Sequence, residues 1–363
     1  MLTIVEDSFG TSEDPLTKQM VPVRRFTFSN SQMVVQVITL GATITSIKVP
    51  NAKGVIDDVV LGFDDVAGYL NPKMNPYFGA TVGRVANRIG HGTFMLNGKR
   101  ITVSKNHNGK HTLHGGFIGF NNVHWTVSDL VPENCSLKLQ HVSADGHEGF
   151  PGEVTATVLF QLTADNCFHV RFDATTTKPT PVNLTNHSYF NLAGHGAGKG
   201  AIQEHRIQIK ADKITATDDD SIPNGVLQDV TATAFDFREL SELGPRIAEQ
   251  SGQGFDDNFC VNLDNNGITV IAKAIHPKSG RWMEVASDQP GVQFYTGNFL
   301  PNTMKMARAI DGKEEKTYAR QGAFCFETQG YPDAVNHENF PSTILNPGEK
   351  YIHNCIYKFG VNA

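Results

Sequence analysis

The chain has 363 residues, of which 39% are hydrophobic and 19% are charged, and its formal net charge is −6. This apolar content is enough to bury a core, and the acidic balance argues against a nucleic-acid partner. No segment approaches the ~20 consecutive apolar residues that a membrane-spanning helix needs, so we expect no membrane partner.

The cysteines argue against a disulfide framework or a zinc cluster. There are five, they are widely spaced, and they form no C-x-x-C pair, a pattern that favours reduced thiols. The stretch MLTIVEDSFGTSEDPL contains early acids and no long apolar run, so it does not resemble a signal peptide. We therefore expect a cytoplasmic protein.

Strand patterns recur along the chain between turns rich in Gly, Pro and Asn. Residues 32–50 form a β-rich run with a bend expected at Gly41. Residues 154–175 alternate apolar and polar side chains on either side of a short turn, which predicts a β-hairpin. Further strands are expected within residues 291–300 and 350–361.

Helical patterns are few and short, at residues 64–71 and 241–250, and Pro245 interrupts the second. Length alone suggests two domains at roughly 150 residues per domain, but no linker or composition shift marks a boundary. We therefore predict an all-β fold, a large antiparallel β-sandwich in which residues 1–363 form a single domain.

The glycine-rich segment 79–94, GATVGRVANRIGHGTF, places Asn87 and Arg88 in a stretch whose other residues have the pattern of a buried segment. Its glycine spacing matches neither G-x-G-x-x-G nor the Walker pattern, which disfavours a phosphate-binding loop. One interpretation is a β connection with surface arginines, and the other is that Asn87 and Arg88 contact a ligand.

Two histidines stand in unusual surroundings. His114 precedes Gly115 and Gly116, which let a backbone turn sharply and approach a ligand, although a lone histidine there is more often structural. His187 lies in NLTNHSYFNL, residues 183–192, where amides and hydroxyls alternate with apolar side chains. This run is either an exposed loop with two N-x-[ST] sequons or the wall of a polar site.

Two carboxylate segments occur in apolar settings. Glu327 is flanked by Phe324 and Phe326, so burial should raise its pKa toward the range of a general base. A structural salt bridge is the alternative interpretation. Asp256 and Asp257 are adjacent, and on a strand their side chains would face opposite ways, so only one can enter a site.

The candidates include no serine nucleophile elbow, no nucleotide fingerprint and no H-E-x-x-H metal motif. A zinc site formed by His114, His187 and Asp256 stays open as an alternative. The preferred hypothesis is general acid–base chemistry on a hydroxylated small molecule, with no cofactor and no metal. Amides, arginine and carboxylates suit sugar hydroxyls, because each hydroxyl both donates and accepts hydrogen bonds.

Six motifs occur in an order that resembles the aldose 1-epimerase family: YFGATVGRVANRI, LHGG, NLTNHSYFNL, GFDDNF, QPGVQFYTGNF and ETQGYPDAVN. The resemblance spans roughly residues 20–360. It implies a large sandwich of mostly antiparallel strands and a cofactor-free interconversion of the α and β anomers of hexoses, chiefly galactose and glucose. The chain departs from the family pattern at three positions. His111 stands where the family often has Asn, Asp257 where His is expected, and Tyr331 where relatives often have Trp.

The resemblance also implies roles for individual residues. Glu327 resembles the general base on the anomeric hydroxyl, and His187 the general acid on the ring oxygen. The residues that resemble the family's substrate contacts are Asn87, Arg88, His114, Asp256 and Gln293. In this mechanism a nearby carboxylate keeps His187 protonated and hydrogen bonds keep Glu327 ionised, so a bell-shaped pH profile is expected. The expected partner is a free aldohexose, and the expected state is a monomer.

Three other functions stay open at this stage. A glycoside hydrolase could use Asp256 and Glu327 as its acid and nucleophile. A non-catalytic carbohydrate-binding protein would rely on exposed aromatic platforms, whereas the chain has only two tryptophans. A hexose-phosphate epimerase would need several arginines in its site, and Arg88 is the one clear candidate.

Overall fold

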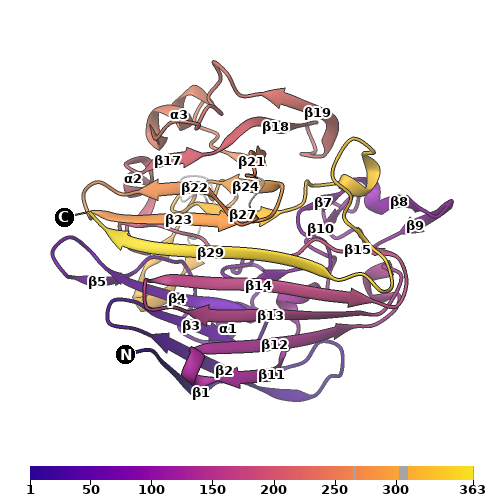
Figure 1. Ribbon diagram of the computed structural model, residues 1–363, viewed down its shortest axis with the longest axis horizontal. Helices are drawn as coiled ribbons and strands as arrows, with labels where there is room; N and C mark the ends of the chain where they lie inside the picture. Colours follow the sequence, from indigo (N-terminus) through magenta and orange to yellow (C-terminus); the bar gives the residue numbers. More distant parts are fainter. Residues whose placement is uncertain (265–266, 302–309, 363) are drawn as a thin grey trace.

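Figure 1 shows the computed structural model, which describes residues 1–264, 267–301 and 310–362. Its strands form antiparallel ladders, and the largest sheet has nine strands. In spatial order they are β11 (Thr126–Val131), β12 (Ser136–Ser143), β13 (Val154–Leu162), β14 (Cys167–Thr176), β29 (Tyr351–Val361), β23 (Arg281–Ser287), β22 (Thr269–Ile275), β17 (Arg206–Ile209) and β20 (Ser241–Glu242).

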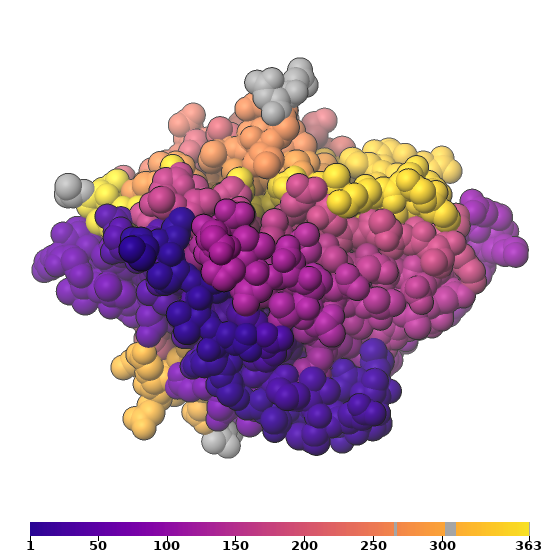
Figure 2. All heavy atoms as spheres, turned by 60° about the horizontal axis from the view of Figure 1, so that its bottom comes forward, coloured from indigo at the N-terminus to yellow at the C-terminus, as the bar shows by residue number. Residues whose placement is uncertain are grey.

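Two five-stranded sheets accompany the nine-stranded sheet. The N-terminal sheet consists, in order, of β1 (Thr3–Glu13), β2 (Met20–Ser29), β3 (Val34–Ile38), β4 (Thr43–Pro50) and β5 (Ile56–Asp58). The third sheet consists, in order, of β19 (Pro223–Asp229), β18 (Ala211–Thr217), β21 (Asp256–Val261), β24 (Gly291–Tyr295) and β27 (Cys325–Gln329). Figure 2 shows the N-terminal strands (indigo) and the β11–β14 segment (magenta) on one face of the molecule.

Shorter elements connect and cover these sheets. The two-stranded ladders are β6 (Thr81–Val82) with β16 (Thr185–Asn186), β7 (Arg88–Ile89) with β10 (Thr112–Leu113), β8 (Thr93–Leu96) with β9 (Lys99–Thr102), β15 (Thr180–Pro181) with β28 (Ile344–Leu345), and β25 (Ile310–Asp311) with β26 (Thr317–Tyr318). The α-helices are α1 (Val66–Leu70), α2 (Gly198–Gln203) and α3 (Leu243–Glu249). The 3₁₀ turns are η1 (Gly90–Gly92), η2 (Phe120–Asn122), η3 (Pro132–Asn134), η4 (His147–Gly149), η5 (Lys313–Glu315) and η6 (Ala334–Asn336). In the described part of the chain, no helix has the length and apolar character needed to cross a membrane.

The core lies between the sheets. Buried and partly exposed residues alternate along β13 and β14, because successive side chains of a strand point to opposite faces. One contiguous group of buried apolar side chains includes residues of all three large sheets. At the contact between β2 and β14, the rings of Phe28 and Phe168 meet edge to face with centroids 5.4 Å apart.

Most of the expected strands are confirmed. The hairpin expected at 154–175 is β13 followed by β14, and the strand expected at 350–361 is β29. Residues 32–50 form β3 and β4, with a bend at Gly41. Gly41 has φ +65°, and a Cβ atom there would lie 2.4 Å from the carbonyl oxygen of Asn121, so only glycine fits this bend.

Two expectations differ in detail from the structure. The strand expected at 291–300 ends at Tyr295, because Gly297 has φ +66° and turns the chain. Helix α3 forms despite Pro245, since this residue lies in the first turn, where a backbone N–H has no intrahelical partner. Helix α2 has no counterpart among the predicted elements.

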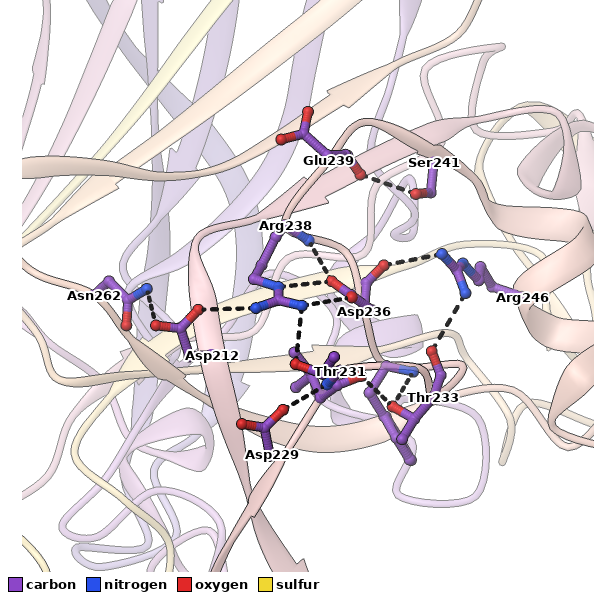
Figure 3. A network of polar contacts seen from close by, with 12 residues as sticks. Asp212, Asp229, Thr231, Thr233, Asp236, Arg238, Glu239, Ser241, Arg246 and Asn262 are labelled. Carbon is purple, nitrogen blue, oxygen red and sulfur yellow. Dashed lines mark hydrogen bonds and ion pairs between the residues drawn. The ribbon is translucent and has the colours of Figure 1, made fainter.

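A polar network fixes the connection between β19 and β20 (Figure 3). The guanidinium of Arg238 donates to both carboxylate oxygens of Asp236, at 2.9 and 2.7 Å, and to the hydroxyl of Thr231 at 3.1 Å. Arg246 of α3 donates to the backbone carbonyl oxygens of Thr233 and Asp236 at 3.3 and 3.1 Å. These bonds hold the connection against α3.

A buried ion pair ties the N-terminal sheet to a segment far along the chain. Lys313 Nζ lies 2.7 Å from Asp58 Oδ2 and donates to Thr45 O at 2.8 Å. Asp58 also accepts from the Ser46 hydroxyl at 2.6 Å. The side chains of Lys313 and Asp58 are only 7% and 4% exposed, so neither charge has much solvent to replace a lost partner.

We expect Lys313→Met to lower the free energy of unfolding by about 3 kcal/mol, because the carboxylate of Asp58 would stay buried without its cation. Urea unfolding followed by tryptophan fluorescence measures the loss. The matched control is Lys350→Met, which removes a partly exposed pair with Asp173, a carboxylate that Arg171 also contacts, and should cost less than about 1 kcal/mol. If both variants lose the same free energy of unfolding, burial of the Lys313–Asp58 pair does not determine its contribution to stability.

Candidate active site

Strands β21, β24 and β27 supply one wall of the candidate site. Asp256 pairs with Tyr295, and Gln293 pairs with Glu327. Because side chains alternate along a strand, these four point to one face of the sheet. The opposite face carries phenylalanines that belong to the main core, namely Phe259, Phe294 and Phe326. The apolar neighbour Phe326 therefore lies on the other side of the sheet from Glu327.

Asp256 and Asp257 face opposite ways, as predicted. Asp256 lines the cavity described below, and its Oδ1 accepts a 2.8 Å hydrogen bond from Gln293 Nε2. Asp257 Oδ2 accepts from the backbone N–H of Asp256 at 3.0 Å. Burial raises the pKa of Asp257 to about 7, with a smaller contribution from the Asp256 charge and opposition from that backbone hydrogen bond.

A second wall contains His187, which follows the short strand β16. The backbone N–H of His187 donates to Ala80 O at 2.9 Å, and its carbonyl accepts from Gly79 N–H at 3.0 Å. The rings of Tyr77 and Tyr189 stack with the imidazole at centroid distances of 5.8 and 5.0 Å and interplanar angles of 21° and 18°. Backbone hydrogen bonds and ring stacking together fix the orientation of this histidine.

The amides beside His187 bond to the backbone of neighbouring loops. The side chain of Asn183 donates to Gly330 O at 3.1 Å and accepts from Gly330 N–H at 2.8 Å. Asn186 Nδ2 donates to Gly79 O at 2.8 Å. Both asparagines are only 2% exposed, so the exposed-loop interpretation of the two sequons is wrong.

The third wall is formed by β7 and by His114, which directly follows β10. The N–H of Asn87 donates to His114 Nδ1 at 3.1 Å, and the N–H of His114 donates to Asn87 O at 2.9 Å. Because Nδ1 accepts a hydrogen bond, neutral His114 carries its proton on Nε2. Gly115 permits this turn, since a Cβ atom there would lie 2.0 Å from the carbonyl oxygen of Gly83.

Arg88 links this third wall to the sheet. Its Nη2 lies 3.9 Å from Asp256 Oδ2, and its Nη1 donates to Asn87 Oδ1 at 3.4 Å. The backbone around Arg88 is held by Asp333, whose N–H donates to Arg88 O at 3.0 Å and whose Oδ1 accepts from Gly90 N–H at 2.8 Å. Asp333 thus fixes the position from which the guanidinium extends.

The three walls enclose a cavity of about 230 Å³. The predicted site residues that line it are Asn87, Arg88, His114, His187, Asp256 and Glu327. Gln293 is not among the lining residues and contacts Asp256 instead.

Several lining residues escape the sequence analysis, namely Pro76, Tyr77, His107, Leu113, Tyr295 and Phe299. Tyr295 could have been found, because it stands two residues from Gln293 on an expected strand and so shares its face. Tyr77 enters the site through a backbone with φ +67°, which no sequence pattern predicts.

Glu327 and His187 meet across the cavity, with 3.6 Å between Glu327 Oε1 and His187 Nε2. Burial, followed by the negative charge of Asp256, raises the pKa of Glu327 well above its usual range, while the charge of Arg88 lowers it. Burial also lowers the pKa of His187 to about 4. Both shifts favour the uncharged form of the side chain.

Two expectations about this pair are corrected by the structure. Glu327 Oε2 has no hydrogen-bond partner among the residues described, so no described protein group provides the bond expected to keep the carboxylate ionised. The pKa of His187 is lowered rather than raised, because lost solvation outweighs the attraction of a nearby carboxylate. A pair whose carboxyl pKa exceeds its imidazole pKa holds one proton over a broad pH range, and the two sites titrate together.

The ligand atoms of His114, His187 and Glu327 lie within 4.8 Å of one another, a spacing that could hold a metal ion. The zinc alternative from the sequence has Asp256 in place of Glu327. The proton on His114 Nε2 counts against coordination, because a neutral imidazole binds metal through its unprotonated nitrogen, and here that nitrogen accepts from Asn87 N–H. The three residues are better suited to exchanging hydrogen bonds and protons with a bound hydroxyl.

Comparison with known proteins identifies the family of the chain. A family model described as Aldose 1-epimerase matches residues 24–358. A galactose mutarotase from Bos taurus is 45% identical over 339 residues, which cover 93% of this chain and 94% of the bovine protein. An aldose 1-epimerase from Escherichia coli (strain K12) is 32% identical over 345 residues, which cover 93% of this chain and 95% of that protein.

Solved structures share the fold. An aldose epimerase homologue from C. elegans has a TM-score of 0.82 at 28% identity, and the match covers 92% of this chain and 98% of that chain. A galactose 1-epimerase from Lactobacillus acidophilus NCFM also has a TM-score of 0.82, at 22% identity, with 100% of both chains covered. These matches confirm the predicted antiparallel all-β class. The family model covers most of the sequence, and the chain belongs to the aldose 1-epimerase family of isomerases.

Proposed function

We propose that this protein is an aldose 1-epimerase that interconverts the α and β anomers of free aldohexoses such as galactose and glucose, without a cofactor. The observation that carries the proposal is the buried pair of Glu327 and His187, 3.6 Å apart in one cavity. Family membership supports the reaction, and the name of the bovine relative supports galactose as a substrate.

In the proposed reaction, Glu327 removes the proton of the C1 hydroxyl while the C1–O5 bond breaks. His187 donates its proton to O5, which leaves an open-chain aldehyde. After rotation about C1–C2, the O5 hydroxyl attacks the other face of the carbonyl, His187 takes back its proton, and Glu327 returns a proton to O1. Each positioned proton transfer contributes about 10²–10⁴-fold to the rate.

The cycle needs one proton on the pair, and that proton starts on His187. In the free site both pKa shifts favour the proton on Glu327. A bound sugar changes this balance, because its C1 hydroxyl donates to the carboxylate and stabilises the ionised form. The rings of Tyr77 and Tyr189, with centroids 5.8 and 5.0 Å from that of the imidazole, stabilise the cation of His187.

The proposed sugar contacts combine donors and acceptors. His114 donates from Nε2, Arg88 and the side chain of Asn87 bond to ring hydroxyls, and Asp256 accepts from them. Gln293 supports this set through its hydrogen bond to Asp256 Oδ1. The aromatic lining adds apolar surface for the C–H faces of the sugar ring.

We further propose a monomeric cytoplasmic enzyme in which residues 1–363 act as one domain. The shared core of the three large sheets supports a single domain. The five cysteines are all free thiols, four of them buried, which supports a reducing compartment.

Glu327→Gln and His187→Asn should each slow catalysed mutarotation at least about 10²-fold, because each removes one positioned proton transfer. Polarimetry on freshly dissolved α-galactose, with the spontaneous rate subtracted, measures the loss. The control Glu133→Gln changes an exposed glutamate and should keep full activity. A Glu327→Gln enzyme that retains most of its activity would show that the base is another group.

The rate should depend on pH through the shared proton. We expect kcat/KM to fall as pH drops through about 4, where the pair takes up a second proton, and to fall again at alkaline pH when the last proton leaves. Polarimetric initial rates across the pH range measure both limbs. An acidic limb near pH 6.5, the value of an ordinary histidine, would contradict the effect of burial on His187.

His114 should be neutral at pH 7, with its proton on Nε2, because Asn87 N–H occupies Nδ1 and burial lowers the pKa of the imidazole well below 6.5. A ¹⁵N correlation spectrum of histidine-labelled protein distinguishes the two tautomers. The signal is assigned by its absence in His114→Asn. A spectrum with the proton on Nδ1 would remove the proposed donor to the sugar.

A further inference from the structure

Three buried amides lie beside Glu327 on the same face of the third sheet. Asn258 pairs with Gln293, which in turn pairs with Glu327, and Gln329 stands two residues after Glu327 on β27. Asn258, Gln293 and Gln329 are 2%, 3% and 0% exposed. We call these three residues the amide layer. They are not among the residues that line the cavity, so they lie beside Glu327 on the sheet and outside the cavity lining.

Most polar atoms of the amide layer lack protein partners, and the exception is Gln293 Nε2, which donates to Asp256 Oδ1. Across the described ranges, seven buried side-chain atoms in this region make no hydrogen bond: Arg88 Nε, Asn258 Oδ1 and Nδ2, Gln293 Oε1, Glu327 Oε2, and Gln329 Oε1 and Nε2. Buried polar groups in proteins are almost always paired, so these atoms need partners from outside the chain.

The unpaired atoms include both donors and acceptors, which favours water as their partner. Arg88 Nε and the amide nitrogens of Asn258 and Gln329 are donors, whereas the remaining four atoms are acceptors. A metal cation would satisfy only the acceptors and would be repelled by the guanidinium. Water both donates and accepts, and buried water typically bridges groups of this kind.

We propose that ordered water molecules bind in the amide layer, that one of them donates to Glu327 Oε2, and that Asn258 and Gln329 are positioning residues that hold this water. The inference rests on the proposed role of Glu327 as the base. The water would supply a hydrogen bond that favours the ionised form of Glu327 and that the described side chains do not supply.

The groups that face Glu327 explain why such a water matters. The ionisable groups that face Glu327 or interact with its charge are Arg88, Asp256, His114, His187, Tyr189, Tyr295, Cys325 and Tyr357. Of these, only Arg88 carries a positive charge at neutral pH, and Asp256 opposes it. A neutral donor that bonds directly to the carboxylate therefore adds a stabilisation that the neighbouring charges do not give.

The variants Gln329→Met and Asn258→Leu test the proposal, because each keeps about the same volume and removes both polar atoms of the amide. We expect each variant to lose about tenfold in kcat and to shift the alkaline limb of the pH profile up by about one unit, since a drier Glu327 binds its proton more tightly. If the alkaline limb of the pH profile is unchanged in both variants, the proposal is wrong.

Thr328→Val is the matched control. Thr328 is adjacent on β27 and 1% exposed, but its hydroxyl bonds to His353 Nε2 at 2.7 Å on the other side of the sheet. This variant should lose thermal stability without moving the pH profile. A limb shift as large as that of Gln329→Met would mean that general loosening of β27, rather than lost water, causes the effect.

A high-resolution crystal structure of the unsubstituted protein gives a test that does not depend on activity or on folding of the variants. We expect a water molecule within hydrogen-bond distance of Glu327 Oε2 that also contacts an amide of Asn258 or Gln329. Amides that pair directly with one another and leave no water would overturn the inference. If the amides pair directly but the wild-type protein catalyses mutarotation, the water proposal fails and the proposed function stands. If the water is present but the wild-type protein is inactive, the proposed function fails.

Discussion

The rest of the site depends on a buried carboxyl and a buried imidazole, those of Glu327 and His187, whose atoms lie 3.6 Å apart. Neither side chain keeps its solvation, so the pair carries one proton, and the position of that proton depends on small differences in its surroundings. The sheet of β21, β24 and β27 buries the pair because its two faces carry different kinds of side chain. Phenylalanines fill the core on one face and exclude water, while Asp256, Gln293 and Glu327 gather on the other. Burial of the residues on this second face produces the pKa shifts of the site.

The other walls are fixed mainly by backbone contacts. Tyr77, Asn87 and His114 all line the cavity, and all have positive φ values, of 67°, 58° and 51°. Non-glycine residues keep such conformations only where surrounding contacts enforce them, and they concentrate at functional sites. Here the contacts are peptide groups, such as the N–H of Asn87 on the ring of His114. The backbone therefore holds these three side chains in the site before a substrate binds.

The sequence predicts the parts of this protein that depend on local pattern. The hairpin of β13 and β14 follows from alternation, and the opposed directions of Asp256 and Asp257 follow from the period of a strand. The candidate residues come from motifs and a family resemblance, and the cavity gathers all of them except Gln293. The positive φ of Tyr77 and the unpaired oxygen of Glu327 could not be foreseen, because both result from contacts between segments far apart in the sequence.

Strand β29, drawn in yellow in Figure 1, lies in the middle of the nine-stranded sheet, between β14 and β23. A growing chain that has not yet reached residue 361 therefore has a gap where its largest sheet should be continuous. During synthesis on the ribosome, β14 and β23 would each present an unpaired edge until this segment emerges, and exposed edges invite pairing with other chains. Chaperone binding to these two edges would therefore protect the nascent chain until β29 is made.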